Sequence, residues 1–219
     1  MKLVHPYYFP PIEINDVEPS ILVIENNLNY RKVVSELIEQ INTGEGDYVL
    51  SEKGKALKLS KEAVFISDLF RLNFDNRQIK GRLLQTLLND AQDYDSSSLI
   101  QGIVSLGSDL SFSSKYPIGF NTELAQIDLL KLLDFYIDMD GLSMVEKIIQ
   151  YMTLCCELLD THLIIMLNAL DIMSKEEYEE FKKEISYNHI PLLMIEHRTQ
   201  NYLYHSDKVM IIDDDLCIL

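Results

Sequence analysis

Five carboxylates lie within 18 residues near the middle of the chain, and their type and spacing raise the question of a metal site: Glu123, Asp128, Asp134, Asp138 and Asp140. Calcium and other hard cations take six to eight oxygen ligands from carboxylates and backbone carbonyls. A break in the helical pattern at residues 117–121 would leave carbonyls free near Glu123 and Asp128. The spacing is not that of an EF-hand, so a metal site and a solvated acidic face both stay open.

A second group with possible chemistry is basic. Eight cations and only three acids lie between residues 53 and 82, a net charge of +5 in a chain of −16: Lys53, Lys55, Lys58, Lys61, Arg71, Arg77, Lys80 and Arg82. Such a patch can bind a phosphate backbone, which the acidic remainder of the chain would repel. The alternatives are edge-strand lysines that discourage pairing between sheets and the solvated side of a helix.

The positions that bind nucleotides in α/β proteins lack the residues that this binding needs. The turn after the first buried apolar run, residues 25–32, contains no glycine, whereas a phosphate cradle needs glycines so that backbone amides can close on the oxygens. The nearest match to a phosphate-loop motif, Gly54-Lys55, has Val49 and Ala56 at two required positions and falls in an expected hairpin. Asn168 replaces the acid that would grip magnesium after the strand 163–167. We therefore expect no ATP hydrolysis.

Nucleophilic and metal-dependent catalysis find no better support. Residues 102–107 are one position out of register with G-x-S-x-G and lie in a helical pattern rather than at a strand-to-helix elbow. The histidines lack metal-binding spacings, and the three cysteines form neither a CxxC pair nor a disulfide framework. The sequence predicts that the protein is not an enzyme.

Short apolar runs on both sides of a long helical segment predict the fold class. Runs at 21–24, 64–66, 163–167, 192–195 and 209–212 are typical of strands buried on both faces of a parallel sheet. Residues 76–160 contain no such run. We predict an α/β head built from residues 1–75 and 161–219, with an all-helical leg, residues 76–160, inserted into it.

Within these elements, local signals predict several boundaries. Ser143 with Glu146 and Ser174 with Glu177 have capping-box spacing, and Thr122 is the expected cap of a helix that runs to residue 135. Gly44 should end the helix after the first strand. Weak alternation around Lys53-Gly54 predicts a hairpin.

Composition limits the remaining possibilities. A chain of 219 residues, 47% hydrophobic, is long enough for a real core, and no apolar stretch approaches the roughly 20 residues needed to cross a bilayer. The N-terminus lacks the continuous apolar segment of a secretory signal. We expect a cytoplasmic location.

The order and spacing of these runs resemble a known family. Residues 1–6, 11–14, 21–26, 64–68, 163–168 and 192–196, together with the helical middle, are similar to the small DNA-end-binding ring proteins of type II-A CRISPR loci, which act in spacer acquisition. The likeness extends over essentially the whole chain. Its motifs are apolar strands without catalytic signatures.

The resemblance implies a specific fold and assembly. It implies a head like that of a P-loop NTPase with a degenerate nucleotide site, an inserted helical leg, and a homotetrameric ring that takes duplex DNA through a lysine-lined hole and is supported by Ca²⁺. The implied partners are double-stranded DNA ends, the CRISPR integrase complex and the RNA-guided effector nuclease. Carried onto this sequence, the implied metal ligands are Glu123, Asp128, Asp138 and Asp140.

The density of basic residues predicts which side chains bind DNA: Lys53, Lys55, Lys58, Arg71, Arg77, Lys80, Arg82 and Lys115. Two other functions stay open. The protein could be an interaction scaffold that uses its helical leg without touching DNA, or a degenerate nucleotide-dependent enzyme or nuclease that uses the acidic cluster.

Overall fold

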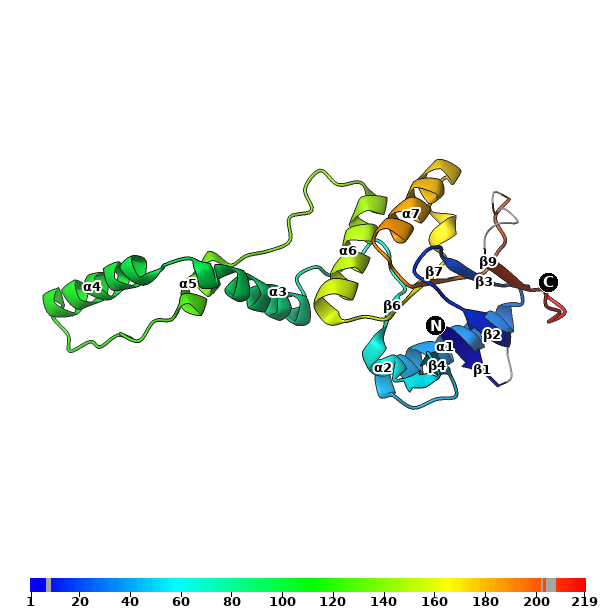
Figure 1. The fold of residues 1–219 in the computed structure, drawn as a ribbon, viewed down its shortest axis with the longest axis horizontal. Helices are drawn as coiled ribbons and strands as arrows, with labels where there is room; N and C mark the ends of the chain where they lie inside the picture. Colours follow the sequence, from blue (N-terminus) through cyan, green and yellow to red (C-terminus); the bar gives the residue numbers. More distant parts are fainter. Residues whose placement is uncertain (7–8, 202, 204–207) are drawn as a thin grey trace. The chain divides into compact units, whose positions relative to one another are not determined.

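The computed structural model describes residues 1–6, 9–201, 203 and 208–219. The chain packs into two compact units (Figure 1). The first unit combines Met1–Asn73 with Met139–Leu219, and the second is Phe74–Asp138. None of the helices in the described part of the chain is long and apolar enough to span a membrane.

The first unit is organised around a five-stranded parallel sheet in the order β6-β7-β8-β3-β9. Its strands are β3 (Ser20–Ile24), β6 (Ala63–Ile66), β7 (Leu163–Leu167), β8 (Leu192–Glu196) and β9 (Lys208–Ile212). Each coincides with one of the expected apolar runs. The prediction of a mixed α/β fold with a parallel sheet is therefore confirmed.

Alternate side chains of this sheet enter two separate cores. Ile21 and Val23 of β3 belong to one core, and Leu22 and Ile24 belong to the other. Helices α6 (Met144–Leu159) and α7 (Lys175–Tyr187) pack on the first face, together with the short turn η2 (Ala169–Asp171). Helix α1 (Asn27–Thr43) and a second, smaller sheet pack on the opposite face (Figure 1).

The smaller sheet is antiparallel, with the order β2-β1-β4-β5. Its strands are β1 (Lys2–His5), β2 (Phe9–Glu13), β4 (Val49–Glu52) and β5 (Lys55–Leu57), and the short helix α2 (Leu59–Glu62) follows. The expected hairpin is present: Lys53 and Gly54, which connect β4 to β5, have φ of 48° and 78°. Two successive residues with positive φ form the tight two-residue turn whose twist matches that of the flanking strands.

A buried amide ties this hairpin to helix α1. Nε2 of Gln40 donates to the carbonyl of Tyr48 at 2.7 Å, and the backbone N–H of Tyr48 donates to Oε1 of Gln40 at 2.8 Å. Gly44 ends α1 in the left-handed region at φ 83°, as expected. These two hydrogen bonds therefore tie the chain at the start of β4 to α1, while β1 and β5 pair with β4 on either side.

The second unit consists of helices with little core. It contains α3 (Arg77–Asp90), η1 (Ala91–Asp93), α4 (Ser97–Ser113) and α5 (Gln126–Leu133). Ile79 is the one buried hydrophobic side chain of residues 74–138, all of which are described. Nε2 of Gln126 donates to the carbonyl of Ala91 at 2.6 Å, which ties α5 to the end of α3.

The second unit is shorter than the predicted leg of residues 76–160, because the last predicted leg helix belongs to the first unit. Ile148, Met152 and Cys155 of α6 are fully buried in the core that covers the parallel sheet. The boundary consequently falls at residue 138. Helical periodicity alone does not distinguish a leg helix from one that covers a sheet.

The capping signals were mostly correct. The capping boxes Ser143–Glu146 and Ser174–Glu177 are both formed. The cap at Thr122 was wrong: the helix begins only at Gln126, where Oδ2 of Asp128 accepts the backbone N–H of Ala125 at 3.0 Å.

The link between α1 and the hairpin gives a stability prediction. Gln40→Leu should lower the free energy of unfolding by about 2–3 kcal/mol, because it leaves the N–H and the carbonyl of Tyr48 buried without partners. Denaturant titration measures the change, and Glu39→Leu at an exposed position of α1 is the control. Equal stability of both variants would contradict the role assigned to Gln40.

Candidate nucleic-acid interface

Four lysines of the first unit stand together on the β4–β5 hairpin and on α2. This lysine hairpin consists of Lys53, Lys55, Lys58 and Lys61. All four are exposed, and within the described part of the chain no acidic side chain pairs with any of them. Lys53 lies in the tight turn and Lys55 begins β5, so their charges add locally.

The nearest acid of α2 has another partner. Nδ1 of His162 lies 2.6 Å from Oε2 of Glu62, which belongs to the same short helix as Lys61. The carboxylate of Glu62 is thus bonded to His162 and not to a lysine of the hairpin. Glu52 lies opposite Lys55 in the β4–β5 register, so four lysines stand against the nearby carboxylates of Glu52 and Glu62 and leave a local excess of positive charge that attracts an anion.

Arg71 is the last predicted cation of the first unit. Its side chain is 87% exposed, and its Nε lies 3.7 Å from Oδ2 of Asp68. An exposed pair of this kind contributes little to stability and can be exchanged for a phosphate at small cost. Arg71 can thus add to the basic surface, although its charge is partly offset.

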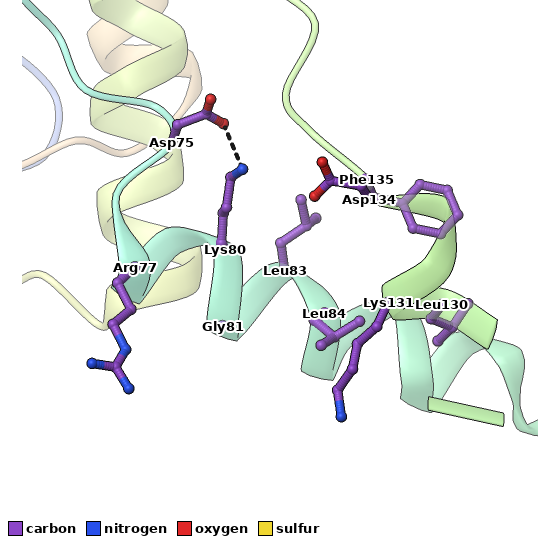
Figure 2. A pocket seen from close by; sticks show the side chains of 10 residues that line it. All are labelled: Asp75, Arg77, Lys80, Gly81, Leu83, Leu84, Leu130, Lys131, Asp134 and Phe135. Atoms are coloured by element: carbon purple, nitrogen blue, oxygen red, sulfur yellow. Dashed lines mark ion pairs between the residues drawn. The ribbon is translucent and has the colours of Figure 1, made fainter. Parts of the chain in front are cut away.

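The remaining predicted cations lie in the second unit. Arg77, Lys80 and Arg82 are on α3, and Lys115 is exposed in the segment after α4. Arg77 and Lys80 line a cavity of about 480 Å³ between α3 and α5 (Figure 2). Nζ of Lys80 points toward Asp75, with 3.5 Å between Nζ and Oδ1.

This cavity includes a cation that the sequence analysis did not choose. Lys131 of α5 lines it opposite Arg77, and Leu84 and Phe135 add apolar surface. In the sequence Lys131 is the lone cation of an acidic stretch. Only the packing of α5 against α3 brings it to the basic residues.

The predicted metal ligands have the right chemistry but do not form a cluster within one chain. Oδ1 of Asp128 lies 3.6 Å from Nζ of Lys131, and its Oδ2 caps α5. Glu123 is exposed in the segment before α5, and Asp138 and Asp140 fall on either side of the boundary between the units. Among the residues that the structure describes, no group of three or more His, Cys, Asp or Glu side chains could hold a metal ion. Their oxygens suit a hard cation, but one chain does not gather enough of them.

The turn between β3 and α1, where a phosphate loop would lie, is already occupied by side-chain bonds. Oδ1 of Asn26 accepts the backbone N–H groups of Leu28 and Asn29, each at 3.1 Å. These amides are the donors that a helix N-terminus offers to a phosphate. The Gly54-Lys55 pair lies in the hairpin, as expected, and not at this turn.

A buried carboxyl lies nearby at the end of β8. Glu196 is 1% exposed, and its Oε1 accepts the backbone N–H groups of Ala169 and Leu170 at 3.0 and 3.3 Å. Burial raises the pKa of Glu196 to about 8, although these two bonds lower it. The sequence does not single out Glu196, because only the fold shows that the residue after this apolar run is still buried.

The comparisons with known proteins identify the family. Residues 40–216 match the family described as CRISPR-associated protein (Cas_Csn2). The chain belongs to the CRISPR-associated Csn2 family. Membership implies a CRISPR-associated role in the acquisition of new spacers. No curated protein matches the chain.

Two solved structures are also similar to the chain. One is an ATP-binding cassette of an ABC transporter in its ADP conformation, with 14% identity and a TM-score of 0.45, covering 100% of this chain and 88% of that one. The other is a nucleotide-free ATP-binding cassette from an ABC transporter, with 12% identity and a TM-score of 0.45, covering 98% and 88%. At this distance they support no inference about activity.

The buried carboxyl predicts a pH dependence of stability. Because the pKa of Glu196 rises from 4.5 to about 8 on folding, its contribution is fully present below pH 4.5 and is lost as the pH rises through 8. Glu196→Gln should remove this dependence and exceed the native protein in stability at pH 9 by about 2–4 kcal/mol. Urea titrations at pH 6 and pH 9 measure the free energy of unfolding, with the exposed Glu39→Gln as control. If the native protein and Glu196→Gln lost the same stability between these two pH values, Glu196 would not be the cause of the pH dependence.

Proposed function

We propose that the protein binds double-stranded DNA ends without regard to sequence and without catalysis. It does so as a homotetrameric ring stabilised by Ca²⁺, in the cytoplasm, during spacer acquisition. The observation that carries this proposal is the lysine hairpin: four exposed cations in a chain of net charge −16, with no acidic partner among the described residues. The coarser part, a CRISPR-associated role in acquisition, follows from the family.

The type of contact follows from the donors. Lysine ammonium groups are point charges that suit phosphates, and phosphate contacts position a duplex without reading its bases. Residues 53–61 contain no arginine, asparagine or glutamine, whose forked groups make paired hydrogen bonds with single bases. Binding is therefore expected to be insensitive to sequence and strongly dependent on salt.

Two observations support a non-catalytic role. The N–H groups at the start of α1 already bond to Asn26, so a nucleotide phosphate would have to displace this cap. Glu196, near that turn, is held protonated at neutral pH by burial, which makes it a poor ligand for magnesium. DNA would consequently be bound and not cleaved.

The second unit supports assembly into a ring. It exposes large apolar side chains, including Leu99, Leu106, Leu110 and Phe112, the last 96% exposed. Apolar surface of this extent usually becomes covered by another chain. A closed ring would admit linear duplex only at an end.

Calcium fits this proposal through the carboxylates of the second unit. Glu123 and Asp128, together with Asp138 and Asp140, would hold the ion only if assembly brings further oxygens to them. Bound Ca²⁺ would offset the repulsion between acidic chains and stabilise the assembled state by mass action.

The lysine hairpin gives the first test. In Lys53→Ala/Lys55→Ala, DNA affinity should fall about tenfold or more. The slope of log K against log salt should shrink by about 0.9 for each phosphate that the variant no longer neutralises. Fluorescence anisotropy on a linear duplex measures both, with Lys147→Ala/Lys183→Ala on the opposite face of the parallel sheet as a control of equal charge.

Two results would reject the DNA proposal. One is an equal reduction in both double variants, which would indicate a general effect of charge. The other is equal affinity for circular and linear duplex of one sequence, which would exclude entry at an end.

Calcium gives the second test. The mass in analytical ultracentrifugation should correspond to four chains in calcium and fall on chelation, because like charges at the carboxylates are then no longer offset. Glu123→Gln/Asp128→Asn should show the chelated mass even with calcium, whereas Asp109→Asn, exposed on α4, should not. If neither the chelator nor the double variant changed the mass of the assembly, calcium would have no role in it.

A protein-interaction scaffold is the second candidate, and the exposed apolar side chains of the second unit favour it. Lys80→Glu/Arg82→Glu distinguishes the two functions. A scaffold would keep its protein partners and show no DNA binding to lose, whereas the DNA binder would lose affinity and salt dependence.

A further inference from the structure

A groove on the first unit has a character opposite to that of the lysine hairpin. It lies between α6 and α7, which pack side by side on one face of the parallel sheet (Figure 1). Its volume is about 650 Å³. Nothing in the proposed DNA binding uses it.

The floor of the groove is apolar. Leu142, Val145 and Ile149 line it from the α6 side, and each is only partly buried. Val145 and Ile149 also pack on the core beneath, so the floor is firmly supported. Val145 and Ile149 are four residues apart on α6, about one helical turn or roughly 6 Å, and Leu142 lies just before the cap of that helix.

The rim of the groove is acidic. Four carboxylates line it, against the single cation Lys183: Glu146, Glu177, Glu180 and Glu184. Two of them are fixed in place by capping boxes, since Oε2 of Glu146 accepts the N–H of Ser143 at 2.7 Å and Oε2 of Glu177 accepts that of Ser174 at 2.8 Å. The rim therefore presents a preorganised negative field around an apolar floor.

We propose that this groove docks a basic amphipathic helix of a protein partner. A helix that carries leucine-like residues at i, i+3 and i+4 would bury them on the floor, and flanking lysines or arginines would meet the rim. DNA is excluded from the groove, because its phosphates would meet a net charge of −3.

A second copy of this chain is a poorer occupant. The most basic helix of the described chain is α3, and its Leu83 and Leu84 already face α5 across the cavity of the second unit. The lysine hairpin is a pair of short strands rather than a helix. A different protein, with a free basic helix, fits better.

The position of the groove gives the proposal its functional meaning. The groove lies on the α6/α7 face of the parallel sheet, whereas the lysine hairpin belongs to the smaller sheet on the opposite face. One chain can therefore hold a basic protein and an anionic ligand at the same time. Docking of the helix does not depend on DNA binding, and its test contains no DNA.

A model peptide tests the groove. The probe is a labelled helical peptide of about 14 residues with a leucine stripe and otherwise lysine, and fluorescence anisotropy measures its affinity for the full chain. Glu180→Lys/Glu184→Lys should weaken binding about tenfold or more. The control Glu39→Lys/Glu157→Lys changes the same charge at exposed positions outside the groove and should stay within about twofold of the native affinity.

A second variant tests the apolar floor without changing charge. Val145→Ser should weaken the peptide about threefold or more while its thermal unfolding shows that the fold is intact. An equal reduction in the rim and control variants would overturn the proposal, as would equal binding of a leucine–glutamate peptide. A change of oligomeric mass in the rim variant alone would assign the groove to a second copy and overturn it as well.

Discussion

Burial of the five-stranded parallel sheet on both faces is the constraint on which the rest of the first unit depends. Along β3, Ile21 and Val23 enter one core while Leu22 and Ile24 enter the other. Because side chains alternate with a period of two, this pattern decides which elements cover which face. It places α6 and α7 with their acidic groove on one side, and α1 with the lysine hairpin on the other.

The same constraint explains why so much of this unit could be predicted. A strand covered on both faces must be apolar along its whole length, so residues 163–167 and 192–195 stand out without any other information. Turn chemistry located the hairpin at Lys53-Gly54, since a tight turn favours residues that tolerate positive φ. The helical segments were harder to predict, because α6 has the periodicity of a leg helix and only the core that it shares with Ile164 and Met166 of β7 assigns it to the sheet.

The candidate sites also differ in how far they could be predicted, depending on whether they form from neighbouring residues or from distant ones. The lysine hairpin could be predicted, because its four lysines lie within nine residues and one turn joins them. The position of Lys131 opposite Arg77 could not, since it depends on α5 packing against α3. The carboxylates are close in sequence, but Asp128 turns to its own helix cap and to Lys131, which spacing does not reveal. The acidic groove is formed by two separate segments, residues 142–150 and 177–184, and no local pattern joins them.

Separation of the two charged surfaces resolves an apparent conflict in this acidic protein. A net charge of −16 would weaken attraction to a polyanion if every acid acted on it equally. Between the lysine hairpin and the acidic groove lie the parallel sheet and one packed layer on each side, and layers of this kind are about 10 Å apart. At physiological ionic strength the Debye length is about 8 Å, so the acids of α6 and α7 are largely screened from the hairpin. The lysine hairpin can then attract an anionic partner and the acidic groove a basic one. The sheet that holds the fold together also separates these two surfaces, so that their charges do not cancel.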